Sequence, residues 1–170
     1  MSGSRRILIV SGVLLAIWGM CFGLYYAVFA EHQALDKIGG SLAAGFVSGA
    51  NGELVEARGS IQNYADTQFD YVRAVDVHSH WIGLAMLLIV FGVTFDRVRF
   101  SEQGRKSLAW IMVSGAIIFP LGVILQTFDR GLIPKVVAGI GAVLVTIALA
   151  AIAFGFARSE RNSWTKELRQ

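Results

Sequence analysis

Four long apolar blocks constrain the fold of this chain more than any other feature. They run from Ile7 to Ala30, Val75 to Phe95, Leu108 to Phe128 and Leu132 to Ala157. Each is long enough to cross a hydrocarbon core of ~30 Å as a helix of ~20 residues. Continuous apolar runs cross lipid as helices, because a helix satisfies its own backbone hydrogen bonds. With 55% apolar and 16% charged residues, the chain is predicted to be all-α, a single integral membrane four-helix bundle over residues 1–170.

The basic residues between the blocks predict the orientation. Ten fall on one side, namely Arg5, Arg6, Arg97, Arg99, Arg105, Lys106, Arg158, Arg161, Lys166 and Arg169. Five fall on the other, namely Lys37, Arg58, Arg73, Arg130 and Lys135. The positive-inside rule then places both termini in the cytoplasm, which fits a bacterial inner membrane with the lipid bilayer as the main partner. No basic stripe of the kind that binds nucleic acid is present, and we exclude that role.

The segment between the first two blocks, residues 31–74, is predicted to be a partly helical extracytoplasmic loop. Residues 33–47 have apolar side chains at helical spacing, and we expect a short helix on the outer surface. A turn at residues 49–52 precedes an amphipathic helix over residues 53–72. The acidic residues of this region are Glu31, Asp36, Glu53, Glu56, Asp66, Asp70 and Asp76. Their excess over three bases would attract cations or a basic soluble electron-transfer protein, although a solvated face gives the same pattern.

Two histidines one residue apart, His78 and His80, stand where this segment enters the second block, and His32 stands where the first block ends. Ionisable side chains at a membrane boundary are costly and by default indicate function. We expect the three rings to gather at the extracytoplasmic face as candidate metal ligands. Three imidazoles with a carboxylate suit zinc, copper or iron, and two opposed imidazoles suit haem.

Helical geometry limits how these histidines can act together. Side chains at i and i+2 on a helix diverge by about 200°, so either one histidine acts alone or His78 precedes the helix. Asp76 lies four residues before His80 and is expected to orient that ring or to cap the helix start. Glu31 and Gln126 are further supporting candidates. Haem in a four-helix bundle usually has histidine ligands on facing helices. The third and fourth blocks contain no histidine, so only one half of this arrangement is present in the chain.

Small residues within the blocks predict close helix packing. They are Gly19, Gly23, Gly115, Gly122, Ala138, Gly139, Gly141 and Ala142. Such residues let helix backbones approach each other in lipid. Pro120 is expected to kink the third helix near Ala116, and Pro134 falls in the first turn of the fourth helix, where a missing N–H costs little.

Several of these elements together resemble a known family. They are residues 17–26, Glu31-His32, residues 77–84, Phe91-Gly92 and residues 118–122. They look like small four-helix bacterial membrane proteins related to subunit I of haem–copper oxidases, which have a His-x-His motif in the second helix. The resemblance implies that His78 or His80 is an axial ligand of haem b. It also implies one haem or metal site at most, shared with a partner subunit, because the oxidase subunit has further helices and histidines that this chain lacks.

Two functions follow from these observations. The first is a haem- or metal-binding subunit of respiratory electron transfer, with His78, His80 and His32 as ligands and Trp81 packed on the cofactor edge. The alternative is a non-catalytic accessory or structural subunit of a larger membrane complex, or a homo-oligomer, in which the histidines only form hydrogen bonds. Hydrolysis is not expected, because Ser79 is the one nucleophile beside a histidine and points away from it on a helix. Whether the chain is an enzyme of another kind stays open.

Overall fold

The structure is a computed structural model that describes residues 2–167, with side chains as far as Ala157. Its elements are α1 (Gly3–Tyr25), the π-helical segment η1 (Tyr26–Ala30), α2 (Glu31–Ala50), α3 (Leu54–Thr94), the 3₁₀ turn η2 (Phe95–Arg97), α4 (Glu102–Leu125) and α5 (Leu132–Glu167). No strand occurs in residues 2–167, so the all-α prediction is confirmed. Arg169 and the side chains of Arg158, Arg161 and Lys166 lie outside what is described.

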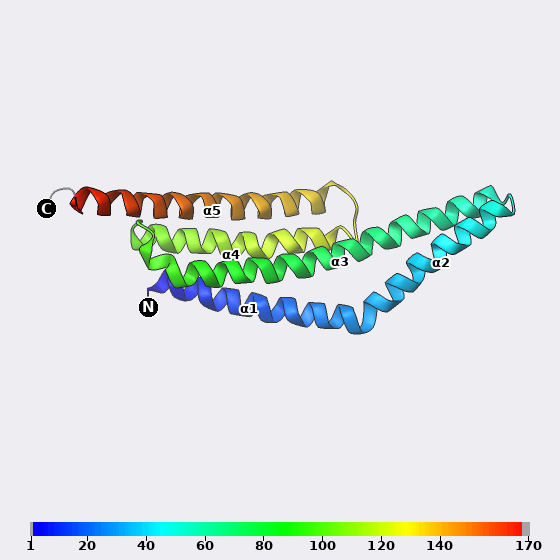
Figure 1. Cartoon of the computed structure of the whole chain (residues 1–170), viewed down its shortest axis with the longest axis horizontal. Helices are drawn as coiled ribbons and strands as arrows, with labels where there is room; N and C mark the ends of the chain where they lie inside the picture. The colour runs from blue at the N-terminus through cyan, green and yellow to red at the C-terminus, as the bar shows by residue number, and fades with distance from the viewer. Residues whose placement is uncertain (1, 168–170) are drawn as a thin grey trace.

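Four antiparallel helices form the bundle (Figure 1). α1 packs along α3, α4 packs along α5, and α3 joins the two pairs. The start of α1 and the end of α5 lie at the same end of the bundle (Figure 1). The helical segments Gly3–Ala50, Leu54–Arg97, Glu102–Leu125 and Leu132–Ala157 are long and apolar enough to cross a membrane. The prediction of four spanning helices is thus met in length and composition.

The bundle core combines branched side chains with glycines at the closest helix contacts. Leu8, Leu88 and Met112 are among its fully buried side chains. A Cβ on Gly122 would overlap the backbone of Ala138, and a Cβ on Gly141 would overlap the backbone of Phe119. α4 and α5 therefore approach almost backbone to backbone, as the small residues predict.

α3 is too long to lie within one bilayer. Its 41 residues span ~60 Å at ~1.5 Å per residue, about twice the ~30 Å hydrocarbon core. Its first half pairs with α2 in a helical hairpin that projects beyond the bundle (Figure 1). We call residues 31–73 the hairpin. Gly52, with φ of 80°, makes the turn between the two helices; a turn is predicted at residues 49–52, and the structure has it at residues 51–53 because α2 continues to Ala50.

The structure corrects two expectations for this region. Residues 31–74 are helical apart from the turn at 51–53, where a partly helical loop is predicted. The short helix expected over residues 33–47 is the 20-residue α2, which projects beyond the bundle together with α3 (Figure 1). The reason is tertiary: Gly45 of α2 packs against Ser60 and Ile61 of α3, which holds α2 beside α3 although Gly39 and Gly40 disfavour a helix.

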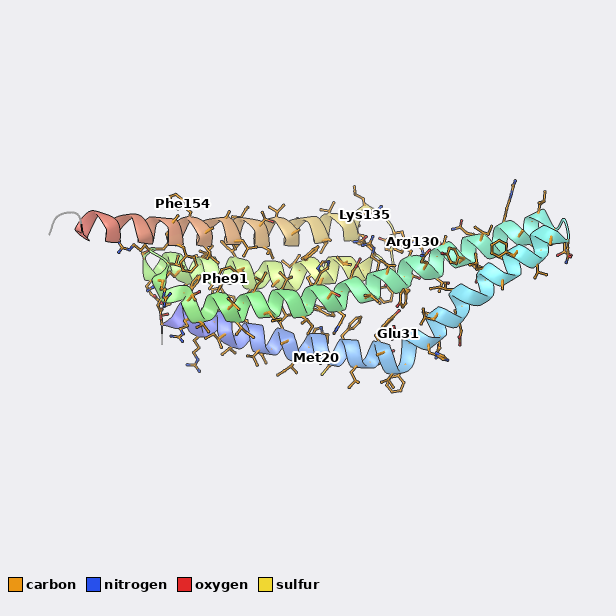
Figure 2. The ribbon with its side chains drawn as sticks, in the orientation of Figure 1. Met20, Glu31, Phe91, Arg130, Lys135 and Phe154 are labelled. Atoms are coloured by element: carbon orange, nitrogen blue, oxygen red, sulfur yellow. The ribbon has the colours of Figure 1, made fainter. Side chains whose placement is uncertain are left out.

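A bend and an ionic contact set the direction of the hairpin. The chain turns at η1, a π-helical stretch that commonly marks bends in helices. α4, by contrast, continues through Pro120 to Leu125 without a break. Arg130, from the connection between α4 and α5, reaches the base of the hairpin and pairs with Asp66 and with Asp70 (Figure 2). Its guanidinium also lies 4.8 Å from the centre of the Phe69 ring.

Candidate functional site around the histidines

His78 lies in a cradle formed by two glycines of α1. Its Nδ1 is 2.9 Å from the carbonyl oxygen of Gly19, and a Cβ on Gly23 would overlap the imidazole ring. Because a carbonyl oxygen only accepts, Nδ1 carries the proton in this hydrogen bond. In the neutral ring Nε2 then has a free lone pair, which is the tautomer of many metal-bound histidines. Gly19 and Gly23 thus make room for the imidazole ring of His78 as well as for a close contact between α1 and α3.

His80 points the other way, toward α4. The centre of its ring is 4.6 Å from that of Phe119. Both histidines lie well inside α3, so the predicted divergence of side chains at i and i+2 is confirmed. The option that His78 precedes the helix is excluded, since α3 begins at Leu54. The two rings face different helices and do not converge on one centre.

His32 lies on α2 and faces solvent. Its side chain is 88% exposed, and its Nε2 is 3.7 Å from a carboxylate oxygen of Asp36, one turn further along α2. The expected gathering of three imidazoles is therefore not found. Within the described part of the chain, no group of three or more His, Cys, Asp or Glu side chains could hold a metal ion.

The supporting residues have partners other than the histidines. Asp76 pairs with Arg73 at 3.2 Å, and its place in mid-helix rules out a helix-start cap. Glu31 accepts a hydrogen bond of 3.4 Å from the Tyr71 hydroxyl. Gln126 is buried and donates to the carbonyl oxygen of Gly122 at 3.3 Å. Each of these three predicted supporting residues thus contacts a residue other than a histidine.

Trp81 is buried between α1 and α3. Its ring meets Phe22 edge to face, with ring centres 5.2 Å apart, and meets Trp18 in the same way at 6.0 Å. Such edge-to-face pairs stabilise aromatic clusters beyond simple burial. The residue predicted to pack on a cofactor therefore packs on two other aromatic rings.

No protein-family model, curated protein or solved structure matches this chain. The resemblance to haem–copper oxidase relatives accordingly stays a prediction from short motifs. Sequence reasoning missed Phe119, Tyr71 and Arg130 as partners at this end of the bundle. Of these three residues, Arg130 could have been found from the sequence, because it is a charged residue in a very short connection on the same side as an acidic segment.

Proposed function

We propose that this chain is an integral protein of a bacterial inner membrane, with cytoplasmic termini, that acts as a non-catalytic accessory subunit of a larger membrane complex. The hairpin is its docking element on the extracytoplasmic side. One observation carries the proposal: large apolar side chains are exposed on a part of the fold that extends past the apolar bundle. These are Leu35, Leu42, Phe46, Val47, Leu54, Val55, Ile61 and Val72.

The energetics of the hairpin support a need for a partner. Of its side chains, only Ala57 is buried, together with the glycine position 45. Two paired helices of this length bury little apolar surface, and helices without a buried apolar face are marginal in water. The exposed side chains include Val55 at 80% and Phe46 at 72%. Covering such a surface is the usual way in which an exposed apolar patch is stabilised.

Charge defines the class of partner. The hairpin contains six acids and three bases, counting residues 31–73 of the sequence. A protein subunit with an apolar patch edged by lysine and arginine side chains complements this surface. The partner is thus a protein domain that meets the hairpin outside the bilayer, and lipid covers the apolar faces of the bundle.

The test compares the size of the native assembly for three proteins. Wild type, the double variant Phe46→Ser and Val55→Ser, and the control Arg58→Ser are extracted from their own membranes in mild detergent and run on native gels. Arg58 is exposed on the same hairpin and carries no large apolar side chain. We expect wild type and control to run in a complex much larger than 18.4 kDa and the double variant to run as a small species.

A second tag distinguishes self-association from a foreign partner. If two differently tagged copies of this chain purify together and account for the whole assembly, the protein is a homo-oligomer and the accessory role is wrong. Wild type that runs as a monomer, or a double variant that keeps the full assembly, also contradicts the proposal. Circular dichroism melts of each variant exclude simple unfolding as the cause.

A haem- or metal-binding role in electron transfer is the second candidate. One observation favours it, namely the hydrogen bond from His78 Nδ1 to the Gly19 carbonyl oxygen, which leaves Nε2 free as a ligand for haem b, copper, iron or zinc. A partner subunit would supply the remaining ligands. Absorption spectra and metal analysis of purified wild type, His78→Ala and His80→Ala test this role. Soret and α bands lost in His78→Ala alone support it, and a colourless, metal-free wild type with normal assembly rejects it.

A further inference from the structure

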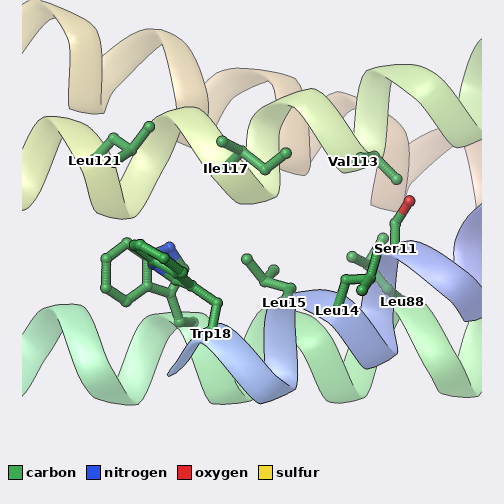
Figure 3. Close-up of a pocket in the computed structure, with 9 residues that line it drawn as sticks. Ser11, Leu14, Leu15, Trp18, Leu88, Val113, Ile117 and Leu121 are labelled. Atoms are coloured by element: carbon green, nitrogen blue, oxygen red, sulfur yellow. The ribbon is translucent and has the colours of Figure 1, made fainter. Parts of the chain in front are cut away.

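A cavity of about 350 Å³ lies between α1, α3 and α4 in the apolar part of the bundle (Figure 3). Its lining is almost entirely apolar and includes Leu14, Trp18, Leu88, Ile117 and Leu121. Leu14 is 61% exposed, so the cavity opens on the outer face of the bundle. We call it the lower cavity, because it lies closer to the start of α1 than the second space, at the bend. Its size is within the ~300–1,000 Å³ of ligand pockets, and its chemistry suits a hydrocarbon chain.

A second hollow of about 590 Å³ lies at the bend, where α1 and α2 separate from α3. We call it the upper hollow. Aromatic rings line it, among them Tyr26 and Tyr71, whose ring centres are 6.3 Å apart. Polar and charged residues line it as well, including Lys37 and Asp70. A hollow with aromatic walls and charges of both signs suits a charged organic group.

The two spaces follow one another along the same three helices. Phe22 of the upper hollow comes one turn after Trp18 of the lower cavity on α1, and Ile124 comes one turn after Leu121 on α4. Trp81 lies at the junction, with its ring against both Trp18 and Phe22. We call the two neighbouring spaces together the seam; its part within the bundle is apolar and its part at the base of the hairpin is polar.

The charges around the upper hollow leave room for a cation. Arg130 is shared between Asp66 and Asp70, so one guanidinium faces two carboxylates. Glu31 adds a third carboxylate beside Tyr71. Lys37 of α2 is the basic residue in the lining. Of these charged residues, Lys37 on α2 and Asp70 on α3 line the hollow itself, and this pair of opposite charges complements a group that carries a positive and a negative charge.

We propose that this seam binds one phospholipid whose headgroup has both a phosphate and a primary ammonium. An acyl chain occupies the lower cavity, Lys37 binds the phosphate, and Asp70 with the aromatic rings binds the ammonium. The inference depends on the membrane insertion proposed above, because only an inserted chain presents the seam to lipid. It does not depend on the docking role of the hairpin.

Native mass spectrometry of the full chain tests the proposal. Delipidated protein in detergent is mixed in turn with phosphatidylethanolamine, phosphatidylglycerol and a prenylquinone. Wild type is expected to retain one phosphatidylethanolamine. Ile117→Trp, which fills the lower cavity, and Lys37→Ala, which removes the phosphate partner, should each retain about tenfold less, equal to ~1.4 kcal/mol.

Two matched variants control for general damage. Ile140→Trp adds the same ring on α5, where Ile140 is 52% exposed and lines neither space. Lys135→Ala removes a lysine that lines neither space. Both should retain lipid as wild type does. The proposal would be overturned if Ile117→Trp and Lys37→Ala retained as much lipid as wild type. It would also be overturned if wild type preferred phosphatidylglycerol or the prenylquinone, or retained no lipid.

The same samples separate this proposal from the proposed function. The hairpin variant Phe46→Ser and Val55→Ser should keep its lipid while it loses its native assembly, and Ile117→Trp should keep its assembly while it loses lipid. Release of the chain from membranes by alkaline carbonate would reject insertion itself, and with it both proposals.

Discussion

The bundle and the hairpin use glycine in opposite ways. In the bundle, Gly122 and Gly141 lie where the backbones of α4 and α5 touch. In the hairpin, Gly39, Gly40 and Gly59 face open space, and Gly45 alone contacts the opposite helix closely. The bundle is therefore held by contacts within the chain, whereas the hairpin has little core of its own. This difference is the basis of the proposal that the hairpin docks on another protein.

The strongest test of this contrast is a large side chain at a bundle glycine. Gly141→Leu should separate α4 from α5, because any side chain at this position overlaps the Phe119 backbone. Overpacking of a close contact costs typically ~1–3 kcal/mol and more when backbone must move. We expect a sharply lower melting temperature in detergent, followed by circular dichroism. Gly139→Leu, two residues away with nothing within 4 Å of its Cβ, is the control and should melt as wild type does.

A smaller effect is expected at the His78 cradle. Gly23→Ala should displace the imidazole ring and break its hydrogen bond to Gly19, at a cost of about 1–3 kcal/mol. Gly83→Ala on α3, where the added methyl meets open space, is the matched control. If the ring is what the methyl displaces, His78→Ala should remove most of the additional cost in a double-mutant cycle. Additive costs of the two substitutions would show that the cradle does not exist.

The smallest effect concerns the ionic contact that holds the hairpin to the bundle. A hydrogen bond from Arg130 lowers the pKa of the Asp66 carboxyl below its ordinary value of 3.8, in the part of α3 that precedes the apolar block. Its contribution is thus present above pH 3.8 and is lost as the pH falls through the lowered pKa in the folded state. The contact is exposed, so the effect is modest.

Amide hydrogen exchange in the hairpin measures this contribution. Asp66→Asn should speed exchange over residues 60–73 at neutral pH relative to wild type, and the difference should shrink when both proteins are compared below the lowered pKa. Asp36→Asn, in the same hairpin but paired only with His32, should leave exchange in that stretch unchanged. A difference between Asp66→Asn and wild type that persists in acid would mean that the ion pair is not its cause.

Local patterns explain why much of the fold was predictable. The four candidate membrane-spanning helices follow from four apolar blocks, and the hairpin turn follows from glycine at residue 52. The divergence of His78 and His80 follows from the helical repeat alone. Each of these features depends on residues that are close together in the sequence. The sequence also predicted the close helix contacts at Gly115, Gly122 and Gly141, because small residues let helices approach in lipid. It was wrong for Gly139, which faces open space, and it missed the close contacts of Gly12 and Gly92.

The surroundings of the candidate site depended on tertiary structure. Sequence position gives the depth of a residue along a helix but not the direction in which it faces, and the three histidines share one end of the bundle while pointing to α1, α4 and solvent. The same holds for Asp76, which pairs with Arg73 because α3 is already helical there. The sequence by itself determined four apolar helices and an acidic segment between the first two. Only helix packing decided that this segment projects as a hairpin and that a glycine cradle holds His78, because the rotation of each helix about its axis is set by the neighbours it contacts.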